Sequence, residues 1–311
     1  MMLDSRVSII IINYNGAGII DRCISSIEDS YGIPHELLVV DNGSTDSSPG
    51  YLERLGSKRP FFTLIKAGKN LGFGKAANLA ASKASGDILL FLNPDTEVTE
   101  HDLSPLINRA KEKDTGIVGP RVLNTDGSLQ YSARSFPTLS RQFYESYFLH
   151  RLFRKNKVLG SYFMTYWDYN SPRRVDWISG AFMLIEEKKF RDIGGFDEGF
   201  FMYSEDTDIC YRLDASGLKN YYDPSYGVIH IDSAIASREE GKREARIWES
   251  RRKYFKKHYT RYHAVALSLI FFAGIINRVL LFLLPALFSQ SSKKKLKGHI
   301  DAIRRYFNKD F

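Results

Sequence analysis

The chain has 311 residues, of which 43% are hydrophobic and 26% charged, and its formal charge is +8. This composition is that of a globular protein, which excludes wholesale disorder, a collagen-like chain and a membrane protein with many spans. The length suits one large α/β domain with an appendage, or two small domains. Cys23 and Cys210 form no C-x-x-C pair, so the sequence predicts neither a disulfide framework nor a thiolate zinc site.

The positive charge is concentrated near the C-terminus. Residues 237–311 contain 18 Lys or Arg against 6 Asp or Glu, a net charge of +12, which leaves −4 on residues 1–236. The mildly acidic body has no basic stripe for a polyanion, so we expect no nucleic-acid partner. No small-residue cleavage site follows the short apolar run at residues 7–12, so a signal peptide is not expected. We expect the protein in the cytosol.

The first hundred residues alternate between strand and helix patterns. Four apolar runs suit strands that are buried on both faces, namely 7–12, 36–40, 61–65 and 87–92. Helical apolar spacing occupies the segments between them, namely 18–30, 48–55 and 74–84. This alternation predicts βαβ units, whose loops after the strands meet at one ligand-binding edge of a mostly parallel sheet.

The regular alternation ends after Pro120. The elements expected there are a hairpin arm at 127–136, an aromatic-rich helix at 141–159, a strand at 176–185 interrupted by Ser179 and Gly180, a helix at 205–216 and short strands at 219–222 and 228–231. We expect four regions: a catalytic domain at 1–236, a basic amphipathic helix at 237–262, an apolar helix or helix pair at 263–290 and a basic tail at 291–311.

Polar residues follow two of the predicted strands at the ligand-binding edge. Asp41 begins an Asp-Asn-Gly turn; turn chemistry alone explains it, and a hydrogen bond from a pyrimidine or a ribose is the alternative. Asn93-Pro94-Asp95 ends the fourth strand, where the proline holds Asp95 at the sheet edge. Because Mg²⁺ bound to a diphosphate needs only one or two protein carboxylates, Asp95 is a candidate metal ligand. His230 is either a further ligand or a structural residue of its apolar strand.

A cluster of carboxylates opens the predicted helix at 205–216. Glu205, Asp206 and Asp208 are explained either as capping residues at a helix N-terminus or as catalytic groups. The preceding segment, 194–203, is rich in glycine and aromatic residues and suits a loop that shapes a pocket. A carboxylate that projects into such a pocket can deprotonate an acceptor hydroxyl.

Six blocks in order along the chain resemble family 2 glycosyltransferases with the GT-A fold, and most of all their bacterial rhamnosyltransferase branch. The blocks are 8–15, 40–46, 70–73, 92–95, 177–181 and 195–212. The resemblance covers roughly residues 5 to 260. It implies a Rossmann-like α/β domain with a mostly parallel central sheet and helices on both faces, followed here by an apolar and amphipathic helical region.

The resemblance also implies roles for residues. Asp206 is expected to be the general base, with Glu205 positioning it or the acceptor. Asp95 is the metal-binding member of a degenerate Asp-x-Asp motif whose first position is Asn93, and His230 is a second candidate ligand. The nucleotide-sugar site is assigned to Asn13, Asn15, Asp41, Asn42, Asn70, Gly72, Phe73, Asn78 and Asn93. The pocket for the acceptor or donor sugar is assigned to Trp177, Ser179, Gly180 and Asp197.

The function that these roles describe is metal-dependent inverting transfer of a sugar in the synthesis of a cell-surface polysaccharide. The expected cofactor is Mg²⁺ or Mn²⁺, the donor is a nucleotide sugar, with dTDP-rhamnose as the first choice, and the acceptor is a glycan or a polyprenyl-diphosphate-linked glycan. Two alternatives remain: a sugar-phosphate nucleotidyltransferase and a catalytically silent membrane-anchored scaffold. The first would need a basic loop after the first strand, and residues 13–16 contain no Lys or Arg.

The apolar residues 264–288 are long enough to cross a bilayer. Asn277 and Arg278 lie at the centre of this block and Pro285 near its end, which disfavours a straight span. Basic residues flank both ends and favour one side of the membrane. We therefore expect one helix, or a broken pair, lying on the cytoplasmic membrane face with its polar centre at the surface. A domain-packing or oligomerisation helix, and hence a homo-oligomer, is the alternative.

Overall fold

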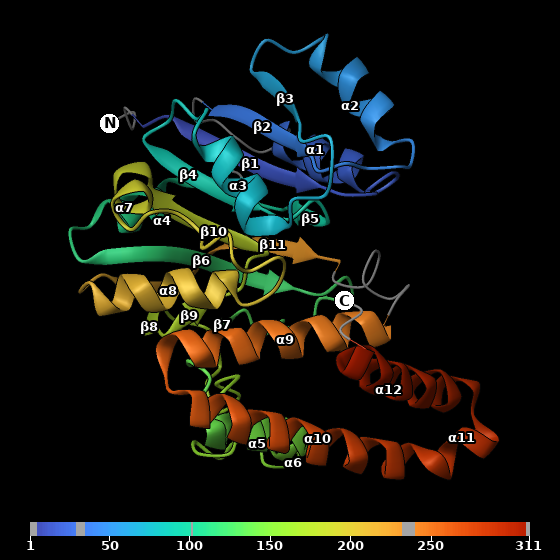
Figure 1. Cartoon of the computed structure of the whole chain (residues 1–311). Helices are drawn as coiled ribbons and strands as arrows, with labels where there is room; N and C mark the ends of the chain where they lie inside the picture. The colour runs from blue at the N-terminus through green and yellow to red at the C-terminus, as the bar shows by residue number, and fades with distance from the viewer. Residues whose placement is uncertain (1–4, 29–34, 101, 232–239, 309–311) are drawn as a thin grey trace. The chain divides into compact units, whose positions relative to one another are not determined.

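The computed structural model describes residues 5–28, 35–100, 102–231 and 240–308 (Figure 1). Two compact units divide the chain. The sheet unit comprises residues 1–135, 168–201 and 205–234, and the helical unit comprises 136–167, 202–204 and 235–311. Residues 136–167, which lie inside the first predicted region, thus group with the C-terminal helices.

The sheet unit is built on a nine-stranded sheet with the order β3-β2-β1-β4-β10-β6-β11-β5, and β8 pairs with β11. The strands are β1 (Val7–Asn13), β2 (His35–Asp41), β3 (Phe62–Lys66), β4 (Ile88–Leu92), β5 (Thr96–Val98), β6 (Thr115–Leu123), β8 (Arg173–Val175), β10 (Phe182–Glu186) and β11 (Lys219–His230). β1 to β4 run parallel, and β6 is parallel to β11. Only β10, β5 and β8 pair antiparallel within it. This confirms the predicted α/β class with a mostly parallel sheet.

Helices accompany the strands as the alternation predicts. The predicted helices are α1 (Ile20–Glu28), α2 (Ser48–Gly56), α3 (Phe73–Ala81) and α8 (Glu205–Ala215). Two further helices, α4 (Ser104–Lys111) and α7 (Glu187–Asp192), were not predicted. Every residue of β1 is buried, which explains its unbroken apolar sequence. Ile9 and Ile11 share one core with Cys23 of α1, whereas Phe91 of β4 belongs to a second core, where its ring centroid lies 5.0 Å from that of Phe196.

The structure defines three predicted elements of the second half more closely. The interrupted strand is confirmed as β9 (Trp177–Ile178) and β10, and β9 pairs with β7 (Ala133–Arg134) from the predicted hairpin arm. The two short strands at 219–222 and 228–231 form the single strand β11 with an irregularity between Asp223 and Gly227. The helix at 141–159 is broken by the left-handed residue Phe148 into α5 (Leu139–Ser146) and α6 (Leu149–Leu152).

The helical unit contains α5, α6, α9 (Glu240–His258), α10 (Arg261–Leu283), α11 (Pro285–Phe288) and α12 (Gln290–Asn308). Residues 237–239 and 309–311 of the predicted regions lie outside the described residues. Trp248 of α9 stacks on Phe271 of α10 with ring centroids 5.0 Å apart, and Tyr306 of α12 meets the edge of the same indole. The predicted basic tail is therefore a packed helix over most of its length.

The polar centre of the apolar block is placed differently from the prediction. Arg278 donates to Glu244 Oε1 of α9 at 2.7 Å, and only 19% of its side chain is exposed. The expectation that this centre reaches the surface is therefore wrong, because an ion pair inside the helical unit takes up its charge. α10 has the length and hydropathy of a membrane span. Only 22% of its most apolar stretch is buried within the protein, so most of that stretch is exposed. Leu269, Ile276 and Leu280 lie on its exposed face.

Candidate functional site

The ends of β1 and β2 bring Asn13 and Asp41 side by side in register. Asn13 is fully buried, and its amide donates to the Ser48 hydroxyl at 2.9 Å and to the Ser44 hydroxyl at 3.2 Å. The Asn42 N–H donates to the Asn13 carbonyl at 2.8 Å. Asn13 thus fixes the turn after β2, and Asp41 sits at the carboxyl edge of the sheet with 7% of its surface exposed.

Asn15 closes the same edge from the loop after β1. Its backbone adopts a left-handed conformation, with φ at 53°. Its side-chain oxygen accepts from the Thr45 N–H at 2.8 Å, and its own N–H donates to the Ser44 hydroxyl at 3.0 Å. The predicted residues Asn13, Asn15 and Asp41 therefore lie in one network of short loops, as expected of strand ends in a parallel sheet.

The loop before α3 is tied to this network through Asn42. The Asn42 side chain accepts from the Leu71 N–H at 2.9 Å and donates to Asn70 Oδ1 and to the Gly72 carbonyl, both at 3.2 Å. Gly72 has φ at 81°, and a Cβ there would collide with the Phe201 carbonyl oxygen, to which the Phe73 N–H donates at 2.9 Å. Only glycine fits this close approach of two loops.

Asn78 and Asp197 hold the glycine- and aromatic-rich loop. The Asn78 side chain accepts from the Phe196 N–H and donates to the Phe196 carbonyl, each at 2.9 Å. Asp197 Oδ1 accepts from the Gly199 N–H at 2.8 Å. The described contacts of both side chains fix the conformation of this loop. The predicted role of Asn78 and Asp197 in binding a sugar would therefore be to hold the loop in shape.

The structure brings Asp95, from the loop between β4 and β5, together with His230, the last residue of β11. Asp95 Oδ1 lies 3.2 Å from His230 Nε2, and the Asn93 amide nitrogen lies 3.3 Å from the same ring atom. Gln130 donates to the His230 carbonyl at 2.7 Å, which turns its side-chain oxygen to His230 Nδ1 at 3.0 Å. Nδ1 is therefore a ring donor, and Nε2 faces the Asp95 carboxylate, to which a neutral ring presents a lone pair.

Two facing acceptors of this kind need a proton or a cation between them. Asp95 and His230 consequently fit a divalent cation in donor type and position. Within the described residues, no group of three or more His, Cys, Asp or Glu side chains is placed to hold a metal. The remaining ligands would be phosphate oxygens and water, as is usual for Mg²⁺ bound with a nucleotide.

Asp206 is the second residue of α8, and backbone donors fix its carboxylate. Oδ1 accepts from the Thr207 N–H at 2.7 Å, and Oδ2 accepts from the Gly180 N–H at 3.1 Å. The next residue, Ala181, accepts from the Asn93 N–H at 3.1 Å. The loop between β9 and β10 therefore connects the Asp206 carboxylate to the strand end that carries Asp95.

Burial sets the protonation of the two neighbouring carboxyls. It raises the pKa of Glu205 well above its usual value, and the charge of Asp206 raises it further. Burial also raises the pKa of Asp206, while hydrogen bonds from Thr207 and Gly180 and the charge of Arg134 oppose the shift. Glu205 Oε2 is buried without a hydrogen-bond partner among the described residues. The two backbone hydrogen bonds to Asp206 favour its ionised form, and the raised pKa of Glu205 favours its neutral form.

Arg134 is a site residue that the sequence did not indicate. It lies in β7, opposite Trp177 of β9, and its guanidinium is 5.0 Å from the centroid of the indole. Trp177 itself is buried and donates to the Ser135 carbonyl at 2.9 Å, and the Ser179 N–H donates to the Ser132 carbonyl at 2.8 Å. Trp177 and Ser179 thus position the segment that holds Arg134 and Gly180.

Replacing Arg134 with glutamine should move the acid limb of the pH profile of kcat/KM to higher pH. The Arg134 charge lowers the pKa of Asp206, so its removal raises that pKa, and the base remains protonated to a higher pH. Arg174→Gln, which removes an exposed arginine elsewhere in the sheet unit, is the matched control. An acid limb at the same pH in Arg134→Gln and wild type would contradict this role.

The chain is similar in sequence to known glycosyltransferases. The model of the family described as glycosyl transferase family 2 matches residues 8–206. The N-acetylglucosaminyl-diphospho-decaprenol L-rhamnosyltransferase of Mycobacterium tuberculosis is 28% identical over 256 residues, which cover 74% of this chain and 78% of that protein. The rhamnosyltransferase WbbL of Escherichia coli is 33% identical over 168 residues, or 51% of this chain and 60% of that protein.

One solved structure resembles nearly the whole chain. The mannosyltransferase PcManGT from Pyrobaculum calidifontis, in complex with GDP-Man and Mn²⁺, superposes with a TM-score of 0.59 at 18% identity. The match covers 99% of this chain and 88% of that protein. At this identity the likeness shows the fold, which is the GT-A fold that the six sequence blocks predicted.

Proposed function

The chain belongs to glycosyl transferase family 2, and we propose that it transfers L-rhamnose from dTDP-rhamnose to a hydroxyl of a polyprenyl-diphosphate-linked glycan. The two relatives named as rhamnosyltransferases support the donor sugar, and the decaprenol-linked substrate of the mycobacterial protein supports the acceptor class. The observation that carries the proposal is the half-buried Asp206 carboxylate, which the loop at Gly180 and Ala181 connects to the strand ends of the nucleotide-sugar edge.

In this proposal Asp206 acts as the general base. It accepts the proton of the acceptor hydroxyl while that oxygen forms a bond to the anomeric carbon of the donor. The bond between that carbon and the diphosphate oxygen breaks at the same time, so the configuration inverts and the nucleoside diphosphate leaves with the electron pair. The N–H groups of Gly180 and Thr207 hold the carboxylate in place, and the neutral Glu205 adds no second negative charge beside it.

The donor and a metal ion are assigned to the edge of the sheet. Asp41 would bind the base or ribose, with Asn13, Asn15, Asn42, Asn70, Gly72, Phe73, Asn78 and Asn93 shaping the donor site. Asp95 and His230 would hold Mg²⁺ or Mn²⁺, a role consistent with the Mn²⁺ in the structural relative. When bound, such a cation neutralises the charge that accumulates on the departing diphosphate.

We also place the protein on the cytoplasmic face of the cell membrane, where a polyprenyl-linked acceptor is presented. The support is the exposed apolar face of α10 together with the charge of +12 on residues 237–311. Each basic residue near an anionic surface contributes about 1 kcal/mol of attraction.

A product assay tests the proposed function. Purified protein is incubated with a panel of nucleotide sugars and a lipid-diphosphate N-acetylglucosamine acceptor, with Mg²⁺, with Mn²⁺ or with a chelator. We expect a rhamnosylated product of inverted configuration only with dTDP-rhamnose, and none with the chelator. Transfer of another sugar would refute the donor, transfer in the chelator would refute the metal role of Asp95 and His230, and no transfer from any donor would favour the scaffold alternative.

A further inference from the structure

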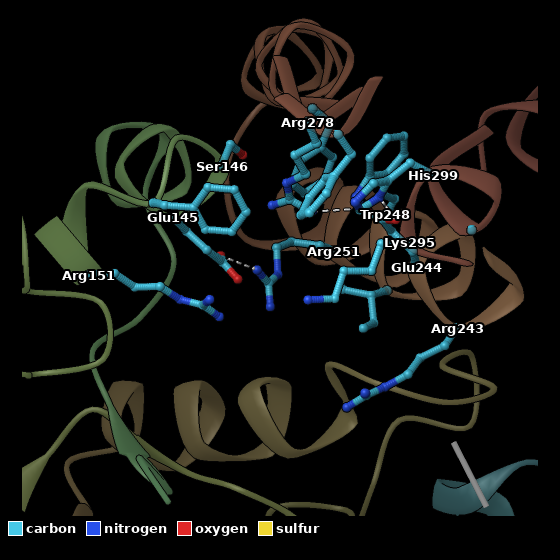
Figure 2. A pocket seen from close by; sticks show the side chains of 15 residues that line it. Glu145, Ser146, Arg151, Arg243, Glu244, Trp248, Arg251, Arg278, Lys295 and His299 are labelled. Atoms are coloured by element: carbon cyan, nitrogen blue, oxygen red, sulfur yellow. Dashed lines mark hydrogen bonds and ion pairs between the residues drawn. The ribbon is translucent and has the colours of Figure 1, made fainter. Parts of the chain in front are cut away.

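A cavity of about 450 Å³ lies within the helical unit (Figure 2), and none of the predicted site residues lines it. Its lining is strongly basic. The cationic residues are Arg151, Arg243, Arg251, Arg278 and Lys295, and the carboxylates are Glu145 and Glu244. With His299 neutral, the lining carries a formal charge of +3. Figure 2 shows the guanidinium groups of Arg151, Arg243 and Arg251 turned toward the same space.

Neighbouring cations engage both carboxylates of the lining. Glu145 pairs with Arg251 at 2.8 Å, and Glu244 pairs with Arg278 at 2.7 Å and with His299 at 2.8 Å. Arg151 and Lys295 instead lie over aromatic rings, those of Phe148 and Phe282, at 5.2 and 5.6 Å from the ring centroids. The charge of these last two side chains is therefore available to a ligand.

The walls of the cavity strengthen this charge. Phe148, Trp248, Phe271 and Phe282 form much of the lining. Apolar walls reduce the screening by water, so an anion inside is attracted more strongly than at an open surface. Guanidinium groups match phosphate oxygens in geometry, and a charge of +3 suits a diphosphate better than a single carboxylate. The volume is that of a pocket for a small ligand.

α10 connects this basic cavity to a hydrocarbon surface. Phe271, Arg278 and Phe282 line the cavity, whereas Leu280 and Leu284, from the exposed apolar side, are 61% and 72% exposed. A free phosphate could use only the cavity, but an amphiphile could place its phosphate group in the cavity and its chain along the exposed leucines.

The helix α9, which lines the cavity, also holds Met202 within the helical unit. The Ser250 hydroxyl of α9 donates to the carbonyl of Met202 at 2.7 Å, and Met202 lies four residues before Asp206 in the sequence. Trp248 and Arg251, which flank Ser250 on α9, line the cavity.

We infer that this cavity binds the diphosphate group of the polyprenyl-linked acceptor, an inference that rests on the proposed function. The test is isothermal titration calorimetry on the full chain, with a chelator present to suppress metal-dependent binding of diphosphate at the donor site. The probes are geranyl diphosphate, inorganic pyrophosphate and phosphatidylglycerol vesicles. The cavity variant is Arg151→Gln with Lys295→Gln. Its control, Lys155→Gln with Lys294→Gln, removes the same charge from exposed lysines outside the lining.

Geranyl diphosphate should bind wild type and the control alike, and the cavity variant at least roughly tenfold more weakly, because charge-assisted hydrogen bonds are lost. Equal affinity in all three proteins would overturn the inference. Pyrophosphate that binds as tightly as geranyl diphosphate would also overturn it, in favour of a free-anion site. Vesicles that bind in a cavity-dependent way while geranyl diphosphate does not bind would overturn it in favour of a lipid headgroup.

Sugar transfer, measured separately, distinguishes this inference from the proposed function. A cavity variant with wild-type KM for the lipid-linked acceptor would refute the inference and leave the function standing. A wild-type protein that binds geranyl diphosphate through the cavity but transfers no sugar from any donor would refute the function alone. All four side chains are exposed, so neither double variant should unfold the chain, and thermal melts of both check this.

Discussion

Replacing Asp206 with asparagine is expected to lower the rate of sugar transfer by about 10²–10⁴-fold, the usual contribution of a general base. The amide has nearly the shape of the carboxylate, and its oxygen can still accept from the Gly180 or Thr207 N–H. It cannot accept the proton of the acceptor hydroxyl. Because Asp206 is assigned to the acceptor step, binding of the nucleotide should persist, and calorimetry with dTDP measures this separately from turnover.

The matched control for this variant is Asp214→Asn, which removes a carboxylate near the other end of the same helix. Asp214 pairs with Arg174 and Lys219, so its loss affects only ion pairs at a partly exposed position. Such pairs contribute at most about 1 kcal/mol to stability. Transfer at the wild-type rate by Asp206→Asn would remove the base assignment, and equal loss in both variants would assign the effect to α8 rather than to its first turn.

The sequence located the donor edge of the site because strand ends in a parallel sheet converge. Asn13, Asp41 and Asn93 each end or follow an apolar run, and a parallel sheet leaves such residues only one edge to occupy. The neighbourhood of Asp95 and His230 was also predicted, although these residues are far apart in sequence, because a known motif supplied the pairing. The first four strands were found to within one residue, whereas β5, β6 and β8 were not predicted.

Other parts of the site depend on contacts that no local pattern encodes. Arg134 reaches the surroundings of Asp206 only because two-residue strands, β7 and β9, pair across more than forty positions. Arg278 was expected at the surface. Its partner, Glu244, lies in a different helix, so the local sequence around Arg278 does not reveal the ion pair. The lysines of α12 suggested a basic tail. The few apolar residues of this helix form a core only together with Trp248 of α9 and Phe272 of α10, and the sequence of α12 alone does not reveal these partners.

The exposed face of α10 should decide where the protein resides. The triple variant Leu269→Ser, Ile276→Ser and Leu280→Ser is expected to lower partitioning onto vesicles that contain phosphatidylglycerol by roughly 10²–10⁴-fold. Fully burying each such side chain is worth about 1.5–3 kcal/mol, and about three-fifths of each surface is exposed and can be buried in the membrane. All three side chains are more than half exposed, so their loss should leave the fold intact. Flotation with vesicles measures the bound fraction, and a thermal melt checks the fold.

The control for the triple variant removes apolar side chains that are equally exposed in another part of the helical unit. Leu152, Phe153 and Val158 are 72%, 52% and 61% exposed and lie outside α10, so their replacement by serine should leave partitioning unchanged. Neither variant alters a charge, and the basic flanks of residues 237–311 act equally in both. If flotation falls equally in the two variants, or in neither, the face of α10 does not dock on the membrane, and the apolar block would instead serve contacts between copies of the chain.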